Sequence, residues 1–221
     1  MIYPACKSLL AFGFCSFAMQ KPCPQKPHDC LQKLHTKTFN QLLTSSSLQR
    51  SYKACTIYKN KTLTKMKKLF IALLIPQLVG ALGSMFTMPN VNVGGWYSVL
   101  HKPAFNPPSW VFSPVWVTLF VLMGIALYWV WKHGIEKKDV KTGMWLFAIQ
   151  LFLNLLWSGL FFGLHDPFLA FIDICLLLVF IILTIFQFQK VSVHAGLIML
   201  PYLFWVGFAT ILNYHIWILN I

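Results

Sequence analysis

Two stretches of this sequence place aromatic and polar side chains at the spacing of a single helix face. Their members recur at steps of three or four residues: Asn154, Trp157, Ser158 and Phe161, and then Tyr202, Trp205, Ala209 and Asn213. Indole and phenol rings offer flat apolar faces and the amides offer hydrogen bonds, which is the chemistry that binds a planar ligand. The alternative is structural: Asn213 and Ser158 would hydrogen-bond neighbouring helices, and the tryptophans would form belts at the membrane surface.

A third aromatic group lies in a proline-rich stretch that leads into a long apolar run. Pro103, Pro107 and Pro108 exclude regular helix before residue 109. Amphipathic rings stand among and after these prolines, at Trp96, Tyr97, Trp110 and Trp116. Such rings settle at a membrane interface or contact a flat ligand. Residues 95–131 are therefore expected to form a lid that continues into a spanning helix.

Asp173 is the one acid that lies well inside an apolar run. A carboxylate within a membrane is costly, so it marks either a functional site or a hydrogen-bonded structural aspartate. No histidine or second acid stands beside it at ligand spacing, so the sequence predicts neither a metal site nor a pair of catalytic carboxylates. The later histidines fall at loops or helix ends, and His215 is the best remaining candidate for an axial ligand.

The composition places these residues in a bilayer. Hydrophobic residues make up 57% of the chain, charged residues 10%, and the mean hydropathy is +0.65. A soluble fold of 221 residues would have too little polar surface to cover itself. Ten of the eighteen Lys and Arg residues lie in the first 65 positions, so the net charge of +13 does not indicate a nucleic-acid partner.

Five apolar runs are long enough to cross a membrane as helices. They cover residues 69–88, 109–131, 140–163, 167–189 and 194–218. The runs are continuous rather than alternating, which excludes a closed barrel. The connections between them are short, so successive helices are antiparallel neighbours. The predicted fold is an all-α membrane protein, a bundle of five transmembrane helices, and the protein is an integral, multi-pass one in a membrane that the sequence does not specify.

The lysines predict the orientation of this bundle. The segment before the first helix, the second loop (132–141) and Lys190 in the fourth loop are basic, whereas the opposite side carries only Lys102. Cytoplasmic loops carry an excess of Lys and Arg, which places the N-terminal side of the bundle in the cytoplasm.

Residues 1–65 differ in composition from the rest. They carry five of the six cysteines and none of the nine tryptophans. Three interpretations stay open: a disordered or targeting extension, a cysteine-based metal module, or sequence upstream of a start at Met66. The absence of a Cys-x-x-Cys pair argues against zinc. The run after Met66 also has features of a signal peptide, but its length favours a spanning helix, so the membrane domain is predicted over 66–221.

Separated motifs in this second part are similar to those of one membrane-protein family. They are Gly95-Trp96-Tyr97, Lys102-Pro103, Asn106-Pro107-Pro108, Trp110-Val111-Phe112, Pro114-Val115-Trp116, Gln150, Leu153-Asn154, Trp157, Phe161-Phe162-Gly163, Asp173, Pro201-Tyr202-Leu203-Phe204-Trp205, Phe208-Ala209-Thr210 and Leu212-Asn213. In this order and at this spacing the chain resembles the TspO/MBR family, the tryptophan-rich sensory or translocator proteins, over residues 67–221.

The resemblance implies a five-helix membrane protein, usually a homodimer, with a cavity between the helices that the first loop caps. Family members bind tetrapyrroles, so protoporphyrin IX or haem is the expected ligand and no further cofactor is required. The ligand-binding residues carried over are Tyr97, Pro107, Trp116, Asn154, Trp157, Trp205 and Ala209. The expected partners are the tetrapyrrole, membrane lipids and a second copy of the chain, and the expected function is to regulate or transport porphyrins.

An alternative function also comes with the resemblance. In bacterial members, the tryptophans that match Trp116 and Trp205 are implicated in light- and oxygen-dependent breakdown of protoporphyrin without a metal, so these two indoles are the candidate catalytic residues. Sterol binding is less expected, because the pattern proposed for it needs a cation soon after a tyrosine. Tyr214 is followed by none.

Overall fold

The computed structural model describes residues 46–91 and 94–221, and all of its regular elements are helices. In chain order they are α3 (Ser46–Val91), α4 (Trp96–Val99), α5 (Ser109–Trp131), α6 (Lys138–Ser158), the π-helical turn η3 (Gly159–Gly163), α7 (Pro167–Val191), α8 (Val193–Leu197) and α9 (Leu200–Leu219). A boundary between Thr64 and Lys65 divides the chain into two units, and everything described below except the N-terminal part of α3 lies in the second.

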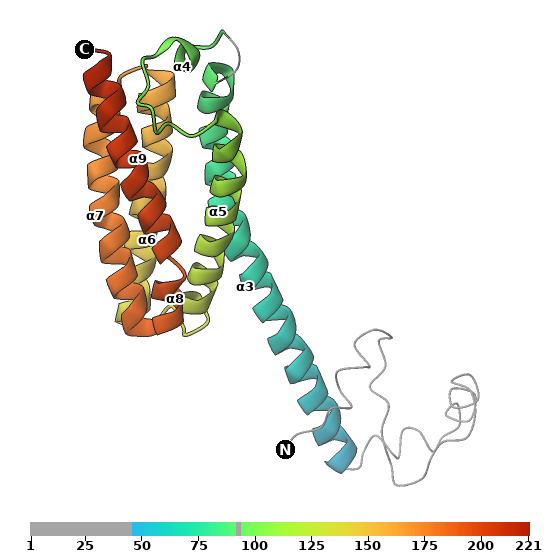
Figure 1. Ribbon diagram of the computed structural model, residues 1–221. Coiled ribbons are helices and arrows are strands. Elements are labelled where there is room, and N and C mark those ends of the chain that lie inside the picture. The colour runs from blue at the N-terminus through green and yellow to red at the C-terminus, as the bar shows by residue number, and fades with distance from the viewer. Residues whose placement is uncertain (1–45, 92–93) are drawn as a thin grey trace, which may run out of the picture. The chain divides into compact units, whose positions relative to one another are not determined.

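The prediction of five transmembrane helices is confirmed within the described residues. The helices long and apolar enough to cross a membrane are Thr56–Val91, Ser109–Trp131, Lys138–Gly163, Pro167–Val191 and Val193–Leu219. Figure 1 shows α5, α6, α7 and α9 side by side, with α4 and the C-terminus at one end and α8 at the other. The protein is therefore an integral, multi-pass membrane protein.

Local sequence explains where the helices begin. Pro108 occupies the N-cap position of α5, and Pro167 begins α7 at the first helical position, where its missing N–H costs nothing. The Asp166 carboxylate caps α7 by accepting hydrogen bonds from the Phe168 and Leu169 amides at 3.0 and 2.9 Å. Both starts were expected from the sequence.

The first and the last helix differ most from the prediction. The first helix begins at Ser46 instead of residue 69, because no glycine or proline interrupts the chain before Pro76. The change of composition at Met66 is therefore not a break in the helix, and the part of that prediction that concerns residues 1–45 lies outside the described residues. The last helix is divided into α8 and α9, because Pro201 has no N–H and a helix restarts around it.

Glycines bring α3 close to its neighbours. A Cβ on Gly124 of α5 would lie 2.8 Å from the Leu73 Cα of α3, and one on Gly83 would lie 3.1 Å from the Ser158 hydroxyl. Gly80 similarly makes room for the Phe120 ring, and Gly163 for Phe86. A Cβ on Gly159 would meet nothing within 4 Å, so this glycine is not part of the close packing. The small residues of α3 therefore form a tight seam with α5 and α6.

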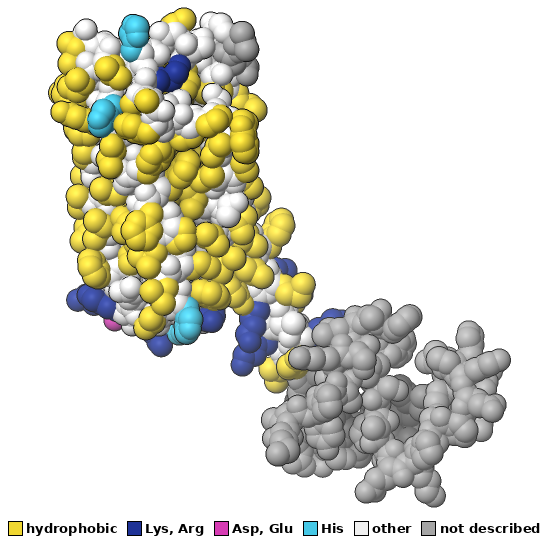
Figure 2. All heavy atoms as spheres, in the orientation of Figure 1, with side chains coloured by type: hydrophobic (Ala, Val, Ile, Leu, Met, Phe, Trp, Pro, Cys, Tyr) yellow, Lys and Arg dark blue, Asp and Glu magenta, His cyan; other side chains and the backbone are white. Residues whose placement is uncertain are grey.

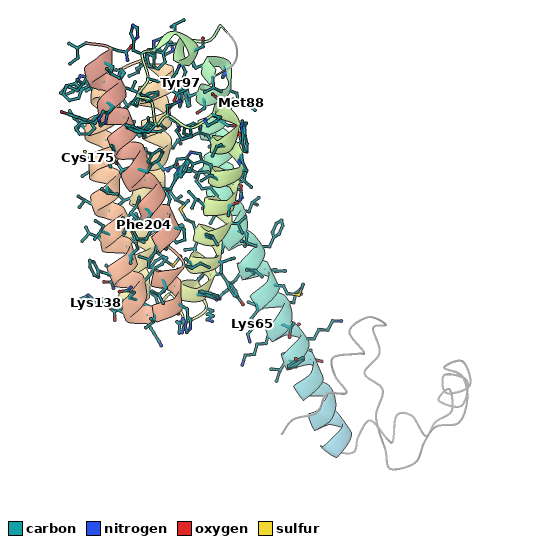
Figure 3. All side chains as sticks on the ribbon, in the orientation of Figure 1. Lys65, Met88, Tyr97, Lys138, Cys175 and Phe204 are labelled. Carbon is teal, nitrogen blue, oxygen red and sulfur yellow. The ribbon has the colours of Figure 1, made fainter. Side chains whose placement is uncertain are left out.

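The surface matches a position within lipid. Figure 2 shows hydrophobic side chains over the flank of the bundle, and dark-blue Lys and Arg side chains gathered at its lower end. Large apolar side chains face outward along this flank, including Trp145, Phe186 and Phe204. Figure 3 places Lys138 at the lysine-rich end and Tyr97, a residue of α4, at the opposite end. The lysines thus mark one membrane surface and the loop with Tyr97 the other.

Candidate ligand-binding site

Three helices bring the predicted tryptophans, asparagine and tyrosine together. The rings of Trp116 on α5 and Tyr202 on α9 lie 6.3 Å apart, and the Asn154 amide of α6 donates a hydrogen bond of 3.2 Å to the Tyr202 hydroxyl. Tyr202 and Asn154 are buried, whereas Trp116 is half-buried. We use the name aromatic wall for the following set: Phe112, Trp116, Asn154, Trp157, Tyr202, Trp205 and Phe208.

Trp205 occupies the middle of this wall with an unused hydrogen-bond donor. Its ring centroid lies 6.0 Å from that of Phe112 on α5 and 5.7 Å from that of Phe208 on α9. The indole Nε1 is buried and has no hydrogen-bond partner. A buried N–H without an acceptor costs free energy, so this atom has unused capacity for an acceptor supplied by a ligand.

The indole N–H of Trp157, unlike that of Trp205, has a hydrogen-bond partner. Its Nε1 donates a hydrogen bond of 2.9 Å to the Asn213 Oδ1 of α9, and its ring stacks on Phe161 at 5.2 Å. The Asn213 amide in turn donates to the Pro167 carbonyl at 2.8 Å. Asn213 therefore connects α6, α7 and α9, which is the structural alternative that the sequence left open. Trp157 can offer a ligand its ring face alone.

The first loop places Tyr97 at the upper end of the wall. Tyr97 is buried and its ring lies 6.3 Å from Phe161 and 5.9 Å from Phe162. Its hydroxyl donates a hydrogen bond of 2.8 Å to the Asn106 Oδ1. The Lys102 ammonium lies 4.7 Å from the centre of the Tyr97 ring and donates to the Tyr97 carbonyl at 2.6 Å. The loop is thus fastened by its own side chains.

Burial also changes the acidity of this tyrosine. Removal from water disfavours the phenolate, and although the hydrogen bond to Asn106 acts in the other direction, the pKa of Tyr97 rises from 10.0 to about 12. Tyr97 therefore stays a neutral hydrogen-bond donor through the physiological range.

The other predicted residues lie at the wall, in the first loop and at the seam of α3. Ala209 is half-buried against the wall, and Pro107 is half-buried in the loop, where its carbonyl accepts a hydrogen bond of 3.1 Å from the Asn106 amide. Ser158 does not join the wall, because its hydroxyl faces Gly83. Ser158 therefore makes a contact between helices, which agrees with the structural alternative given in the sequence analysis.

His165 is part of the loop contacts and was not predicted. It adopts φ 57°, in the left-handed region, and its ring stacks on Trp96 at 4.5 Å while Nε2 lies 2.9 Å from the Asn90 Oδ1. Trp96 is therefore packed against the loop that precedes α7, whereas Trp110 is 74% exposed as an interface residue would be. No periodicity marks His165 in the sequence, because it lies in a turn.

The remaining polar candidates lie in or beside the helices. The Asp173 Oδ2 on α7 and the Gln150 Oε1 on α6 are buried acceptors without a hydrogen-bond partner. The Nδ1 of His215 donates to the Ile211 carbonyl at 2.8 Å, because a carbonyl oxygen can only accept. Nε2 is then the nitrogen of His215 that could ligate an iron.

The TspO/MBR family profile matches residues 72–218, which overlap all five spans and include the aromatic wall. The chain belongs to the TspO/MBR family. It is 49% identical to the tryptophan-rich protein TspO of Chlorobaculum tepidum over 142 residues, which cover 64% of this chain and 89% of that protein. It is 43% identical to the TspO of Archaeoglobus fulgidus over 154 residues, 69% of this chain and 97% of that protein.

Relatives from animals are named translocator proteins. The chain is 37% identical to the translocator protein of Bos taurus over 145 residues, which cover 65% of this chain and 85% of that protein. The family assignment made from the motifs is thus confirmed. For this TspO/MBR protein, the five-helix fold and the position in a membrane are shown, whereas the predicted cavity, ligand and homodimer stay predictions.

Proposed function

We propose that this TspO/MBR protein binds a tetrapyrrole, with protoporphyrin IX as the first candidate, against the aromatic wall. The observation that carries the proposal is the buried Nε1 of Trp205, an N–H donor without an acceptor between the rings of Phe112 and Phe208. A porphyrin has a large flat face for the rings of Trp116 and Trp205 and carries acceptor atoms for this N–H.

The loop above the wall supports the same ligand. A protoporphyrin bears two carboxylates, which need cations or donors near the mouth of a site. Lys102 is the lysine at this end among the described residues, and its ammonium already lies within the loop that holds Tyr97. We infer that the carboxylates lie toward Lys102, with the macrocycle below them between α5 and α9.

A titration in the dark tests this proposal. Protoporphyrin IX is added to the purified full chain in detergent, and the porphyrin absorbance band is followed. A saturable shift of the band, which empty detergent micelles do not produce, is the expected result. A shift that grows without saturation, equal to that in empty micelles, would show partition into detergent and contradict the proposal.

The biological use of such binding is regulation or transport of porphyrins, in the form of a homodimer within the lipid. Degradation of the ligand is the second candidate, because both indoles that it needs lie on one wall, with Trp116 against Tyr202 and Trp205 three residues further along α9. Haem is the alternative ligand, for which His215 is the candidate axial residue. Sterols fit less well, since the chain lacks a cation after Tyr214.

Illumination distinguishes porphyrin binding without turnover from porphyrin degradation. If the protein degrades its ligand, illumination in air bleaches bound protoporphyrin, and the double variant Trp116→Phe with Trp205→Phe stops the bleaching while it still shifts the porphyrin band in the dark. If the wild-type complex keeps its spectrum under illumination, the protein binds without turnover. Bleaching that continues in the double variant would exclude the two indoles as catalytic residues.

A further inference from the structure

A hollow at the lysine-rich end of the bundle is separate from the aromatic wall. Its lining comes from three places in the chain: the connection after α5, the first turn of α6 and the end of α7. The residues that line it are His133, Lys137, Asp139, Val140, Lys190 and Val191. Figure 3 shows that this end, marked by Lys138, lies opposite the end that carries Tyr97. The proposed porphyrin site therefore does not account for it.

The lining of this hollow carries more positive than negative charge, with two lysines against one carboxylate. Lys137 and Lys190 are exposed, and neither has a salt bridge within the described part of the chain. Asp139 is the one acid in the lining, and it is held toward α7: the Gln187 amide donates to its Oδ1 at 3.2 Å and to its backbone carbonyl at 3.1 Å. The two lysines thus outnumber the single carboxylate, and the Oδ1 of that carboxylate is bonded to Gln187.

The backbone adds donors to the same place. Gly134 has φ 102°, a conformation that favours glycine, and the turn it forms is closed by a hydrogen bond of 3.3 Å from the Lys137 N–H to the Gly134 carbonyl. This turn places Lys137 at the N-cap of α6, where no side chain caps the helix. The amides of the first helical turn have no partner inside their own helix, and they supplement the lysines as donors to an anion.

The position in the membrane indicates which anion is available. This end of the bundle also carries Lys67, Lys68, Lys132, Lys138 and Lys141. The Lys68 ammonium lies 5.8 Å from the centre of the Trp131 ring, at the end of α5. Lysines and tryptophans together at the ends of spans mark the membrane surface, where the abundant anion is the phosphate of a phospholipid. We propose that this hollow binds the phosphate headgroup of an anionic phospholipid.

Lipid binding to the full chain tests the proposal. The chain is purified in detergent, and bound lipid is counted by native mass spectrometry as phosphatidic acid is added, with phosphatidylcholine as the comparison. The pocket variant is Lys137→Gln with Lys190→Gln. The matched control is Lys138→Gln with Lys141→Gln, which removes the same charge from the same end but leaves the lining intact. Loss of each charge-assisted contact to the phosphate is expected to weaken binding about 5-fold, so the pocket variant should bind phosphatidic acid about 25-fold more weakly. The control keeps both contacts and should lose much less.

Three results would overturn the proposal. Equal weakening in the pocket variant and the control would show a diffuse attraction of the whole basic end. Equal binding of phosphatidic acid and phosphatidylcholine would show that the hollow does not distinguish an anionic headgroup from a zwitterionic one. Saturable binding of inorganic phosphate by the wild-type chain, with no preference for phosphatidic acid, would assign the hollow to a soluble anion. Thermal unfolding of each variant in detergent shows whether the fold is retained, and a pair Lys137→Arg with Lys190→Arg should restore binding.

Discussion

Two indoles on the aromatic wall differ in what they leave for a ligand. The N–H of Trp157 is satisfied by Asn213, whereas the N–H of Trp205 is buried without an acceptor. Leaving such a donor unpaired costs about 1–3 kcal/mol. A ligand with an acceptor at this point recovers that free energy on binding. We therefore expect Trp205 to contact the ligand by both its ring and its nitrogen, and Trp157 to position the wall through its stack with Phe161.

Tyr97 should ionise at an unusually high pH. Because burial raises the pKa of its phenol to about 12, the folded protein keeps a proton that the unfolded chain loses above about pH 10. The contribution of Tyr97 to stability is then fully present below about pH 10 and is lost as the pH rises through about 12. The tyrosinate absorbance of the wild type minus that of Tyr97→Phe should show one group titrating near pH 12. A difference that titrates near pH 10 would mean that the loop leaves Tyr97 in water.

Helical spacing predicted part of this site and missed the rest for a physical reason. The step of four residues correctly placed Trp157 and Phe161 together, and their rings stack. The same rule placed Ser158 with them, but an apolar stripe spans a broad arc, and Ser158 lies at its edge against Gly83. Phe112 could have been found by the same spacing, since it lies one turn before Trp116 on α5.

At the scale of elements, the seam between α3 and α5 depends on small residues. Lipid tails are as apolar as the side chains, so helices in a membrane associate through close packing and hydrogen bonds. Gly124 lies where the backbone of α3 passes, and the Gln77 amide of α3 donates to the Val117 carbonyl of α5 at 3.2 Å. This seam holds the helix that carries Trp116.

A methyl group at Gly124 should open the seam. The new Cβ would meet the Leu73 Cα at 2.8 Å and the Ala72 carbonyl oxygen at 2.9 Å, and backbone atoms cannot rotate away. Gly124→Ala is therefore expected to destabilise the protein by about 1–3 kcal/mol. The control is Gly207→Ala on α9, where an added Cβ meets nothing within 4 Å. Thermal unfolding in detergent measures both. Equal midpoints for the two variants would mean that α3 is not packed as described.

Element boundaries show where the sequence is decisive. Prolines at Pro108 and Pro167 fixed the starts of α5 and α7, because a proline restricts the backbone at its own position. The predicted start of the first helix was wrong, because a change in composition does not end a helix where glycine and proline are absent, as they are between Ser46 and Pro76. His165 in its turn was missed because loop contacts such as its stack on Trp96 depend on tertiary structure, which no local period encodes.

At the scale of the whole molecule, five spans place the two ends of the bundle's chain on opposite sides of the membrane. The lysine-rich connection between α5 and α6 should face the cytoplasm, and the C-terminus after Ile221 should face away from it. Reporter fusions in bacteria measure this. Alkaline phosphatase fused after Ile221 should be active, and green fluorescent protein inserted at Ile135 should fluoresce. The reverse result would show that the lysines do not orient this bundle.

The affinity for protoporphyrin IX tests the proposed site most directly, by comparing two tryptophans of the same chain. Trp205 lies on the aromatic wall, whereas Trp145 on α6 is 65% exposed on the outer flank. In dark titrations of the full chain, Trp205→Ala should raise the Kd by about 10- to 100-fold, the range for loss of an aromatic contact worth ~1.5–3 kcal/mol. Trp205→Phe should give a smaller loss, and Trp145→Ala should leave the Kd unchanged. Equal Kd values for the wild type, Trp205→Ala and Trp145→Ala would contradict the site on this wall.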